Sequence, residues 1–336
     1  MRFEDPPLPA DVADLLRRGH GVLGTAEAER LGVTRSRMSR LAGSGRLVRL
    51  ARGVYADAAA YAAADEWRAF ELRSRAFVLA CGPRAVVGGW SAAAVWRLPV
   101  IGGPPELPSV FVPEGSGAAV NSRYGMVRAA ALPRRHEAIV RGCPTTVLPR
   151  TVVDVARKAP RADALVMADA ALTTRMTKKA LSAVLDMEAG WPGRAAAAWV
   201  SEHADPYAES PLETLGRLTF IERGLPVPLS NVWVDVGGAR YRVDHLLPDR
   251  WLVVEGDGAL KYDNRPDAGR VVADQREREW RLREAGLDVV RYDWRLAQHQ
   301  RGQLADRFAH AVAANPVRAE PFPWWRDPQP RERLLV

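Results

Sequence analysis

The stretch that most constrains this chain is residues 240–257, where two runs rich in β-branched and aromatic residues flank a Pro-Asp-Arg sequence. Such runs predict two β-strands joined by a turn at residues 248–250, which is a hairpin. Side chains alternate between the two faces of a strand, so Asp244 lies on one face of the first strand, while Glu255 and Asp257 share a face of the second. The hairpin therefore brings three carboxylates toward one another.

Acids at the end of an apolar strand need something that offsets their desolvation, and a divalent cation does this well. Asp244 and Glu255 are therefore candidate metal ligands. A second interpretation stays open, in which these acids cap strand ends or pair with Arg242 and Arg250. His245 follows Asp244 and faces the other side of the strand, so it is not expected to join the site.

The order of Asp244, a turn, an apolar strand and then Glu-Gly-Asp-Gly at 255–258 resembles the PD-(D/E)XK nuclease superfamily, in particular the domains related to very-short-patch-repair endonucleases. Further segments carry the same resemblance: the helix start at 210–213, the Lys-Tyr pair at 261–262, and a closing helix and strand at 276–294. The resemblance extends over residues 205–315 and implies a restriction-endonuclease-like α/β core with a mixed sheet.

The resemblance implies hydrolysis of phosphodiester bonds in double-stranded DNA with Mg²⁺ (or Mn²⁺), because such a metal polarises the phosphate and activates water. It assigns the metal to Asp244, Glu255 and Glu213, and catalysis to Asp244, Glu255, Asp257, Lys261 and Glu213. Two features depart from the superfamily pattern: Asp257 stands where a lysine is usual, and no histidine lies between residues 257 and 298. Lys261 is either the replacement cation or an ordinary turn residue.

The N-terminal residues predict a helix-turn-helix. Helices are expected at 10–18, at 25–31 with Thr25 as its cap, and at 35–41 with Thr34 as its cap, with a tight turn at Gly32. The alternating run at 46–55 predicts a hairpin that gives the module a wing. In such a motif the second helix of the pair enters the major groove, so residues 35–41 are the expected reading helix.

No acid occurs between Arg30 and Arg52. Val33, Met38 and Leu41 are expected to face the core. The expected DNA-binding residues are Arg35, Ser36, Arg37, Arg40, Arg46, Arg49 and Arg52, which suit phosphates and guanine edges. The module resembles the winged helix of type IV abortive-infection antitoxins, down to its closing Arg-Gly-Val-Tyr at 52–55, and this implies a cognate toxin or defence partner. A winged helix used for protein contact is the alternative.

The expected fold class is α/β, or α+β for the whole chain. The expected domains are a winged helix-turn-helix at 1–56, a middle antitoxin-like α/β region at 66–204 after an Ala-rich link, the nuclease-like domain at 205–315 and a Pro- and Trp-rich tail at 316–336. In the middle region, Asp154 and Asp169 lie among apolar neighbours and are expected to answer Arg150 or a backbone amide; a functional role for these acids is the alternative. Arg276 and Arg278 belong to a basic helix that either rests on DNA or is solvated.

Composition is consistent with a nucleic-acid partner. The formal net charge is +8, and 47% of the residues are hydrophobic against 26% charged, as in a globular protein that meets a polyanion. Cys81 and Cys143 are far apart in sequence, so we expect reduced thiols in a cytoplasmic protein without a membrane segment.

Together these patterns predict a DNA-binding, metal-dependent endonuclease-like protein acting in defence, toxin-antitoxin or repair biology. The alternative is a non-catalytic, antitoxin-like transcriptional regulator whose nuclease fold is degenerate.

Overall fold

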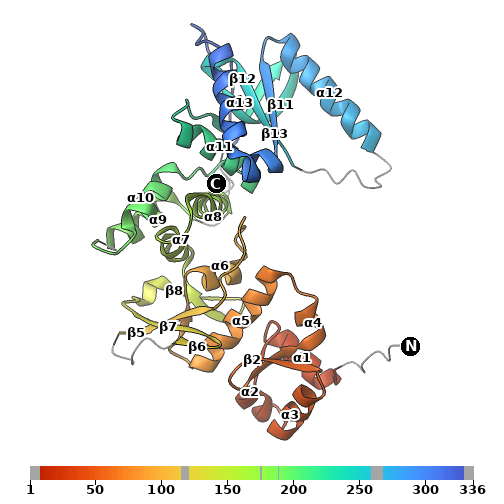
Figure 1. Cartoon of the computed structure of the whole chain (residues 1–336), viewed down its shortest axis with the longest axis vertical. Helices are drawn as coiled ribbons and strands as arrows, with labels where there is room; N and C mark the ends of the chain where they lie inside the picture. Colours follow the sequence, from red (N-terminus) through yellow and green to blue (C-terminus); the bar gives the residue numbers. More distant parts are fainter. Residues whose placement is uncertain (1–7, 115–120, 175, 188, 259–267, 329–336) are drawn as a thin grey trace. The chain divides into compact units, whose positions relative to one another are not determined.

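The structure is a computed structural model that describes residues 8–114, 121–174, 176–187, 189–258 and 268–328 (Figure 1). It divides the chain into two compact units. The first contains residues 1–98, 102–159 and 179–198, and the second contains residues 99–101, 160–178 and 199–336. The described residues form helices and three β-sheets. The predicted mixed α/β class is therefore confirmed.

The first unit begins with the helices and the wing that the sequence predicts. Helices α1 (Ala10–Arg18), α2 (Thr25–Arg30) and α3 (Arg35–Gly43) pack on a sheet of order β1-β3-β2, made of Leu23–Gly24, Val54–Asp57 and Leu47–Ala51. The core of this winged helix contains Val33, Met38 and Leu41, each at most 3% exposed. The turn between α2 and α3 contains Gly32 at φ +87°, a conformation that favours glycine.

The two predicted caps of these helices have different outcomes. The Thr34 hydroxyl accepts a hydrogen bond from the Arg37 amide at 3.3 Å, so Thr34 caps α3 as predicted. The prediction for Thr25 is wrong, because Gly24 holds the cap position of α2. The Thr25 hydroxyl instead donates to the Gly53 carbonyl at 2.8 Å and so ties α2 to the wing.

The rest of the first unit is built on a second sheet of order β6-β7-β5-β4-β9-β8. Its strands are Asn121–Ser122, Gly125–Ala130, Ser109–Pro113, Val86–Val87, Cys143–Thr146 and Glu137–Val140, in that order. Helices α5 (Glu66–Cys81), α6 (Trp90–Trp96) and α7 (Leu148–Ala156) accompany it. The Ala-rich segment that was expected to link the winged helix to the middle region contains a short helix, α4 (Ala58–Ala62). Asp57 caps the start of this helix.

Helix α9 (Lys178–Met187) lies mostly in the first unit, and α10 (Arg194–His203) contributes residues to both. The second unit then contains α8 (Arg161–Thr174), α11 (Pro211–Arg223) and a sheet of order β10-β11-β12-β13. The strands are Leu229–Val236, Ala239–Leu247, Leu252–Asp257 and Asp288–Asp293. The first three are antiparallel and β12 pairs with β13 in parallel, so the predicted mixed sheet is confirmed.

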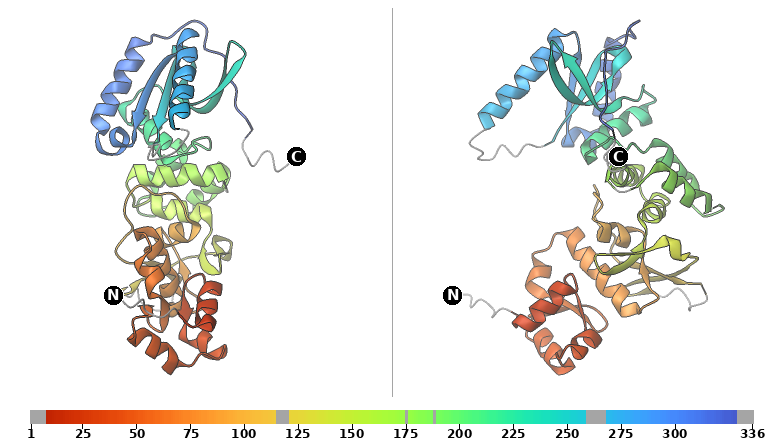
Figure 2. Two further views of the ribbon diagram at one scale, coloured as in Figure 1. Left: turned by 90° about the vertical axis from the view of Figure 1, so that its right-hand side faces the viewer. Right: turned by 180° about the vertical axis from the view of Figure 1, so that it is seen from behind.

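Helices cover both faces of this mixed sheet (Figures 1 and 2). On one face, Leu212 and Phe220 of α11 and Phe308 of α13 (Arg301–Ala314) pack with Val254. On the other face, Leu282 of α12 (Ala268–Glu284) packs with Val243, Val253 and Val289. Successive residues of β12 therefore point to opposite helical layers, as the pleat of a strand requires.

The hairpin turn and the tail differ in detail from the sequence interpretation. Residues 248–250 form one 3₁₀ turn, and Trp251 has φ +53°, so β12 begins at Leu252 and not at the tryptophan. The tail is anchored as expected: Trp325 forms a backbone bridge with Trp233 of β10, and the two rings stack with centroids 6.3 Å apart.

Two further features of the described residues bear on the sequence expectations. Cys81 and Cys143 are both free thiols, as expected. Among the described helices, none combines the length and the apolar character that crossing a membrane requires.

Candidate functional site

The reading helix of the winged helix presents a basic face. Arg35, Ser36 and Arg40 of α3 are exposed, while Met38 and Leu41 on the same helix are buried. We call Arg35, Ser36 and Arg40 the recognition face. The predicted division between core and outward residues is therefore confirmed for this helix, and the recognition face is exposed to solvent.

Arg37 is only partly available on this helix. Its guanidinium donates two hydrogen bonds to the Asp11 carboxylate of α1, at 2.5 and 2.9 Å. The hydrogen bond from Arg37 lowers the pKa of Asp11. Sequence reasoning missed this contact, because Asp11 and Arg37 are 26 positions apart and no local pattern joins them. Arg35 also reaches an acid, Glu29 of α2, at 3.3 Å between two exposed side chains.

The wing adds further cations beside α3. Arg49 and Arg52 are exposed, and Arg46 is half-buried. The Arg49 Nε donates to the Ala51 carbonyl at 3.3 Å, which holds this side chain along the strand. The predicted DNA-binding residues of the N-terminal module thus lie on α3 and on the wing that follows it.

The predicted acids of the hairpin gather at one pocket. His245 of β11 pairs with Val254 of β12, so Asp244 and Glu255 are the next residues along these antiparallel strands. They line a pocket of about 400 Å³ together with Asp257, Gln275 and Arg291. We call this the acidic pocket. The sequence predicted three of its side chains; Gln275 and Arg291 were not assigned to the site.

Burial perturbs both inner carboxyls of the acidic pocket. Glu255 is 7% exposed, and burial, followed by the charge of Asp244, raises its pKa to about 7. Burial also raises the pKa of Asp244, although the Gly256 amide donates to its Oδ2 at 2.8 Å. Burial therefore disfavours the charged form of both carboxyls.

Arginines partly neutralise the acidic pocket, but they are not the ones that the sequence suggested. Arg278 of α12 donates to Glu255 Oε1 at 2.7 Å and to the Arg242 carbonyl at 2.6 Å. Arg291 of β13 forms a bidentate pair with Asp257. Arg278, expected on a DNA-facing helix surface, is therefore committed to the pocket.

The alternative pairing of the acids with Arg242 and Arg250 is wrong. Arg242 pairs with the exposed Glu209. Arg250 donates to the carbonyls of Val312 and Asn315 at 3.0 and 2.7 Å. Both arginines thus stabilise neighbouring segments, and neither neutralises Asp244 or Glu255.

Glu213 lies at the start of α11 and is used for capping. Its carboxylate accepts from the Glu209 amide at 2.8 Å, the Ser210 hydroxyl at 2.7 Å and the Asn231 side chain at 2.5 Å. Ser210 in turn accepts from the Glu213 amide at 3.2 Å, a reciprocal arrangement of the capping-box type. A direct bond from Glu213 to a metal would have to replace these hydrogen bonds.

His245 lies on the opposite side of its strand from the acidic pocket. Burial lowers the pKa of His245 to about 4, and its Nε2 lies 3.1 Å from the Glu213 carbonyl on the α11 side, so it is separate from Glu255 as expected. Arg276 is exposed on α12. Lys261 lies outside the described residues.

The donor set of the acidic pocket fits part of a hard-cation site. Mg²⁺ is usually held by one or two carboxylates with waters and substrate phosphates completing the shell, and Asp244 with Glu255 supplies two. In the described part of the chain, however, no group of three or more His, Cys, Asp or Glu side chains is arranged to hold a metal ion. The fit therefore extends to two carboxylates and not to the three predicted from sequence.

Comparison with known proteins adds to the N-terminal assignment. An uncharacterized protein of Mycobacterium tuberculosis, found in strains CDC 1551 / Oshkosh and ATCC 25618 / H37Rv, is 32% identical over 162 residues. The match includes 47% of this chain, and this chain spans 58% of the length of those relatives. Residues 11–56 match a family model described as "Transcriptional regulator, AbiEi antitoxin". The N-terminal module of this chain is therefore similar to transcriptional regulators of the AbiEi antitoxin kind.

Proposed function

We propose that this chain is a DNA-binding regulator of the antitoxin type, in which the winged helix holds duplex DNA. The observation that carries the proposal is the recognition face of α3, exposed above a buried core within the segment that matches the regulator family. Arginine side chains suit both phosphate oxygens and guanine edges. The antitoxin likeness also points to a cognate toxin as the protein partner.

The DNA-binding proposal predicts a specific loss in the variant Arg35→Ala/Arg40→Ala/Arg49→Ala. Each of these exposed cations is expected to replace a counterion on a phosphate. The triple variant should therefore bind duplex DNA about tenfold more weakly or worse, and the slope of log affinity against log salt should fall by roughly 2 to 3. Fluorescence anisotropy with a duplex that the wild-type protein selects from a random pool measures both quantities.

The matched control is Arg84→Ala/Arg123→Ala/Arg134→Ala, which removes the same charge from exposed positions of the first unit outside residues 11–56. This control is expected to keep the wild-type salt slope. Equal slopes for all three proteins would remove the winged helix from DNA binding and leave protein contact as its function.

A second candidate function, metal-dependent cleavage of DNA, is favoured by the acidic pocket. Its support is that the carboxyls of Asp244 and Glu255 line one pocket and that burial raises the pKa of both. These two residues would hold the ion, which when bound would polarise a phosphodiester and lower the pKa of an attacking water. Arg291 lines the same pocket, where it holds Asp257.

Cleavage is tested by incubating supercoiled plasmid with the wild-type protein and with Glu255→Ala, with and without Mg²⁺ or Mn²⁺. The nuclease proposal expects nicking by the wild type in the presence of the ion and none by Glu255→Ala. Glu284→Ala, which removes an exposed acid of α12, should nick like the wild type. Equal nicking by all proteins, or nicking by none, would overturn the nuclease proposal and leave the regulator proposal as the sole candidate function.

A further inference from the structure

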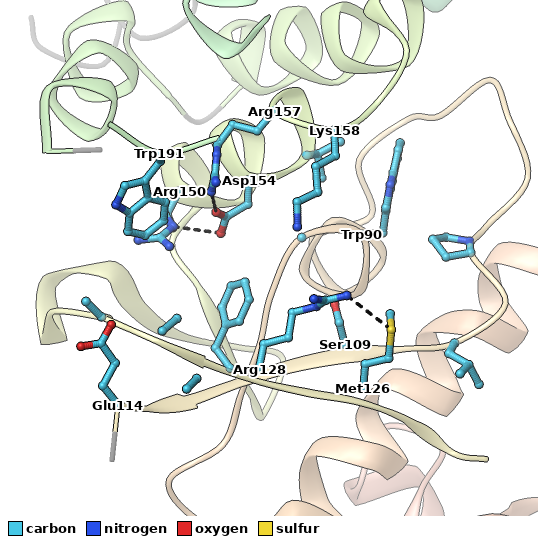
Figure 3. Close-up of a pocket in the computed structure, with 18 of the residues that line it drawn as sticks. Trp90, Ser109, Glu114, Met126, Arg128, Arg150, Asp154, Arg157, Lys158 and Trp191 are labelled. Carbon is cyan, nitrogen blue, oxygen red and sulfur yellow. Dashed lines mark hydrogen bonds and ion pairs between the residues drawn. The ribbon is translucent and has the colours of Figure 1, made fainter. Parts of the chain in front are cut away.

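A second concave site lies in the first unit, between strands β5 and β7 and helices α6 and α7 (Figure 3). Its volume is about 440 Å³, within the range of roughly 300–1,000 Å³ that is usual for small-molecule sites. The lining includes cations and aromatic rings that suit different parts of one ligand, together with the acids Glu114 and Asp154. The cations are Arg128, Arg150, Arg157 and Lys158, and the aromatic rings are Phe70, Trp90, Phe111 and Trp191.

Two of the four cations form ion pairs with an acid of the same cavity. Arg150 and Arg157 approach Asp154 at 2.9 and 3.6 Å. Both guanidinium groups also lie 4.7 Å from the ring centroid of Trp191, which is within the range of a cation–π contact. In this cluster of Arg150, Asp154, Arg157 and Trp191, one carboxylate offsets part of the charge of two arginines.

Arg128 and Lys158 are different. Lys158 extends from the end of α7 and Arg128 from β7, and both cationic groups point into the same cavity (Figure 3). Arg128 donates a weak hydrogen bond to Met126 Sδ at 3.5 Å. Burial, followed by the charges of Arg128 and Arg157, lowers the pKa of Lys158. Like charges are thus held together where an anion would stabilise them.

The aromatic half of the cavity offers a flat apolar surface beside these cations. Trp90 and Phe111 are half-buried, and Trp90 lies on the same side of the cavity as Lys158 (Figure 3). Aromatic side chains bind bases through stacking that every base can make. A ligand that joins an anionic group to a planar ring would use both halves.

We propose that this cavity binds a nucleoside phosphate, with the phosphate on Arg128 and Lys158 and the base against Trp90 and Phe111. The chemistry is shared by two sources, a free nucleotide and a nucleotide unit of a single strand. The site is separate from the recognition face and from the acidic pocket, so it stands or falls independently of DNA binding by the winged helix.

The test is a calorimetric titration of the full chain with ATP, with inorganic phosphate and with a single-stranded oligodeoxynucleotide. The variants are Arg128→Met/Lys158→Met, which removes the anion site, and Trp90→Leu, which removes the flat surface. Arg84→Met/Arg134→Met is the matched control, since both arginines are exposed and lie outside the cavity. Removing two cations that repel each other is expected to leave the thermal transition unchanged or raised, which a melting curve checks.

The proposal expects ATP or the oligonucleotide to bind the wild type and the control alike, and to bind each cavity variant about tenfold more weakly or worse. A loss confined to ATP identifies a free nucleotide, and a loss confined to the oligonucleotide identifies a strand. Equal affinities of wild type and cavity variants for both probes would overturn the proposal. Inorganic phosphate binding as tightly as ATP would overturn the assignment of the base to the aromatic half.

Discussion

Asp169→Ala is expected to destabilise the second unit by about 3–5 kcal/mol, the cost of leaving one charge of a buried pair without its partner. Asp169 of α8 is 1% exposed and accepts from Arg217 of α11 at 2.8 Å, from the Asp205 amide at 2.7 Å and from the Thr214 hydroxyl at 2.8 Å. Burial raises the pKa of Asp169 to about 6, and the positive charge of Arg217 acts against this rise. Arg217 therefore helps to keep the Asp169 carboxylate ionised at neutral pH. In the Asp169→Ala variant, the Arg217 guanidinium stays in the interior and has weaker contacts than it makes with Asp169.

Chemical denaturation of Asp169→Ala, Arg217→Met and the double variant measures this effect. The two single losses are expected to be non-additive, because the double variant no longer buries an unpaired charge. Asp163→Ala in the first turn of the same helix is the control and should cost less than about 1 kcal/mol. Additive losses would show that Asp169 and Arg217 stabilise the unit through separate contacts.

Glu255→Gln is expected to stabilise the protein on the order of 2 kcal/mol at pH 8 when no divalent cation is added. The pKa of Glu255 in the folded protein is raised to about 7, against 4.5 for the free side chain. Below pH 4.5 both the folded and the unfolded protein are protonated at this position, and burial of the carboxyl costs no charge. As the pH rises from 4.5 to about 7, the unfolded state ionises first and the wild type loses stability.

Glutamine resembles the protonated acid, so the difference in unfolding free energy between Glu255→Gln and wild type should grow across that pH range and stay constant above it. Mg²⁺ or Mn²⁺ should stabilise the wild type and narrow the gap if the acidic pocket binds the ion. Glu284→Gln is the control and should follow the wild type. A variant less stable than the wild type at pH 8 would mean that Arg278 outweighs the burial of Glu255.

Much of the local structure follows from sequence patterns of short range. The cap at Thr34, the turn at Gly32 and the alternation at 46–55 predicted the winged helix, and the alternation at 240–257 predicted that Asp244 and Glu255 would lie side by side. The apolar neighbours of Asp154 also predicted that it would be buried and answered by Arg150 or a backbone amide, and the structure shows Arg150 donating to it at 2.9 Å. In each case the deciding contacts lie within one element or between neighbours in sequence.

What sequence reasoning missed depends on contacts between distant segments. Arg278 and Arg291 reach the acidic pocket from α12 and β13, and nothing in their own segments indicates which acid they meet. For Asp169 the expected backbone amide is that of Asp205, but its cation is Arg217 of α11 and not Arg150. Glu213 was predicted to be a metal ligand from its position in a motif. In the structure, its carboxylate oxygens accept hydrogen bonds from Glu209, Ser210 and Asn231.

The contact between α1 and the reading helix has a further consequence. The Asp11 carboxylate already accepts hydrogen bonds from the Arg37 guanidinium. A phosphate of an incoming polyanion would therefore have to displace Asp11 in order to bind that side chain. If the winged helix holds DNA as proposed, the Arg37–Asp11 contact would weaken the hold of α3 on its target relative to what its content of arginine alone suggests.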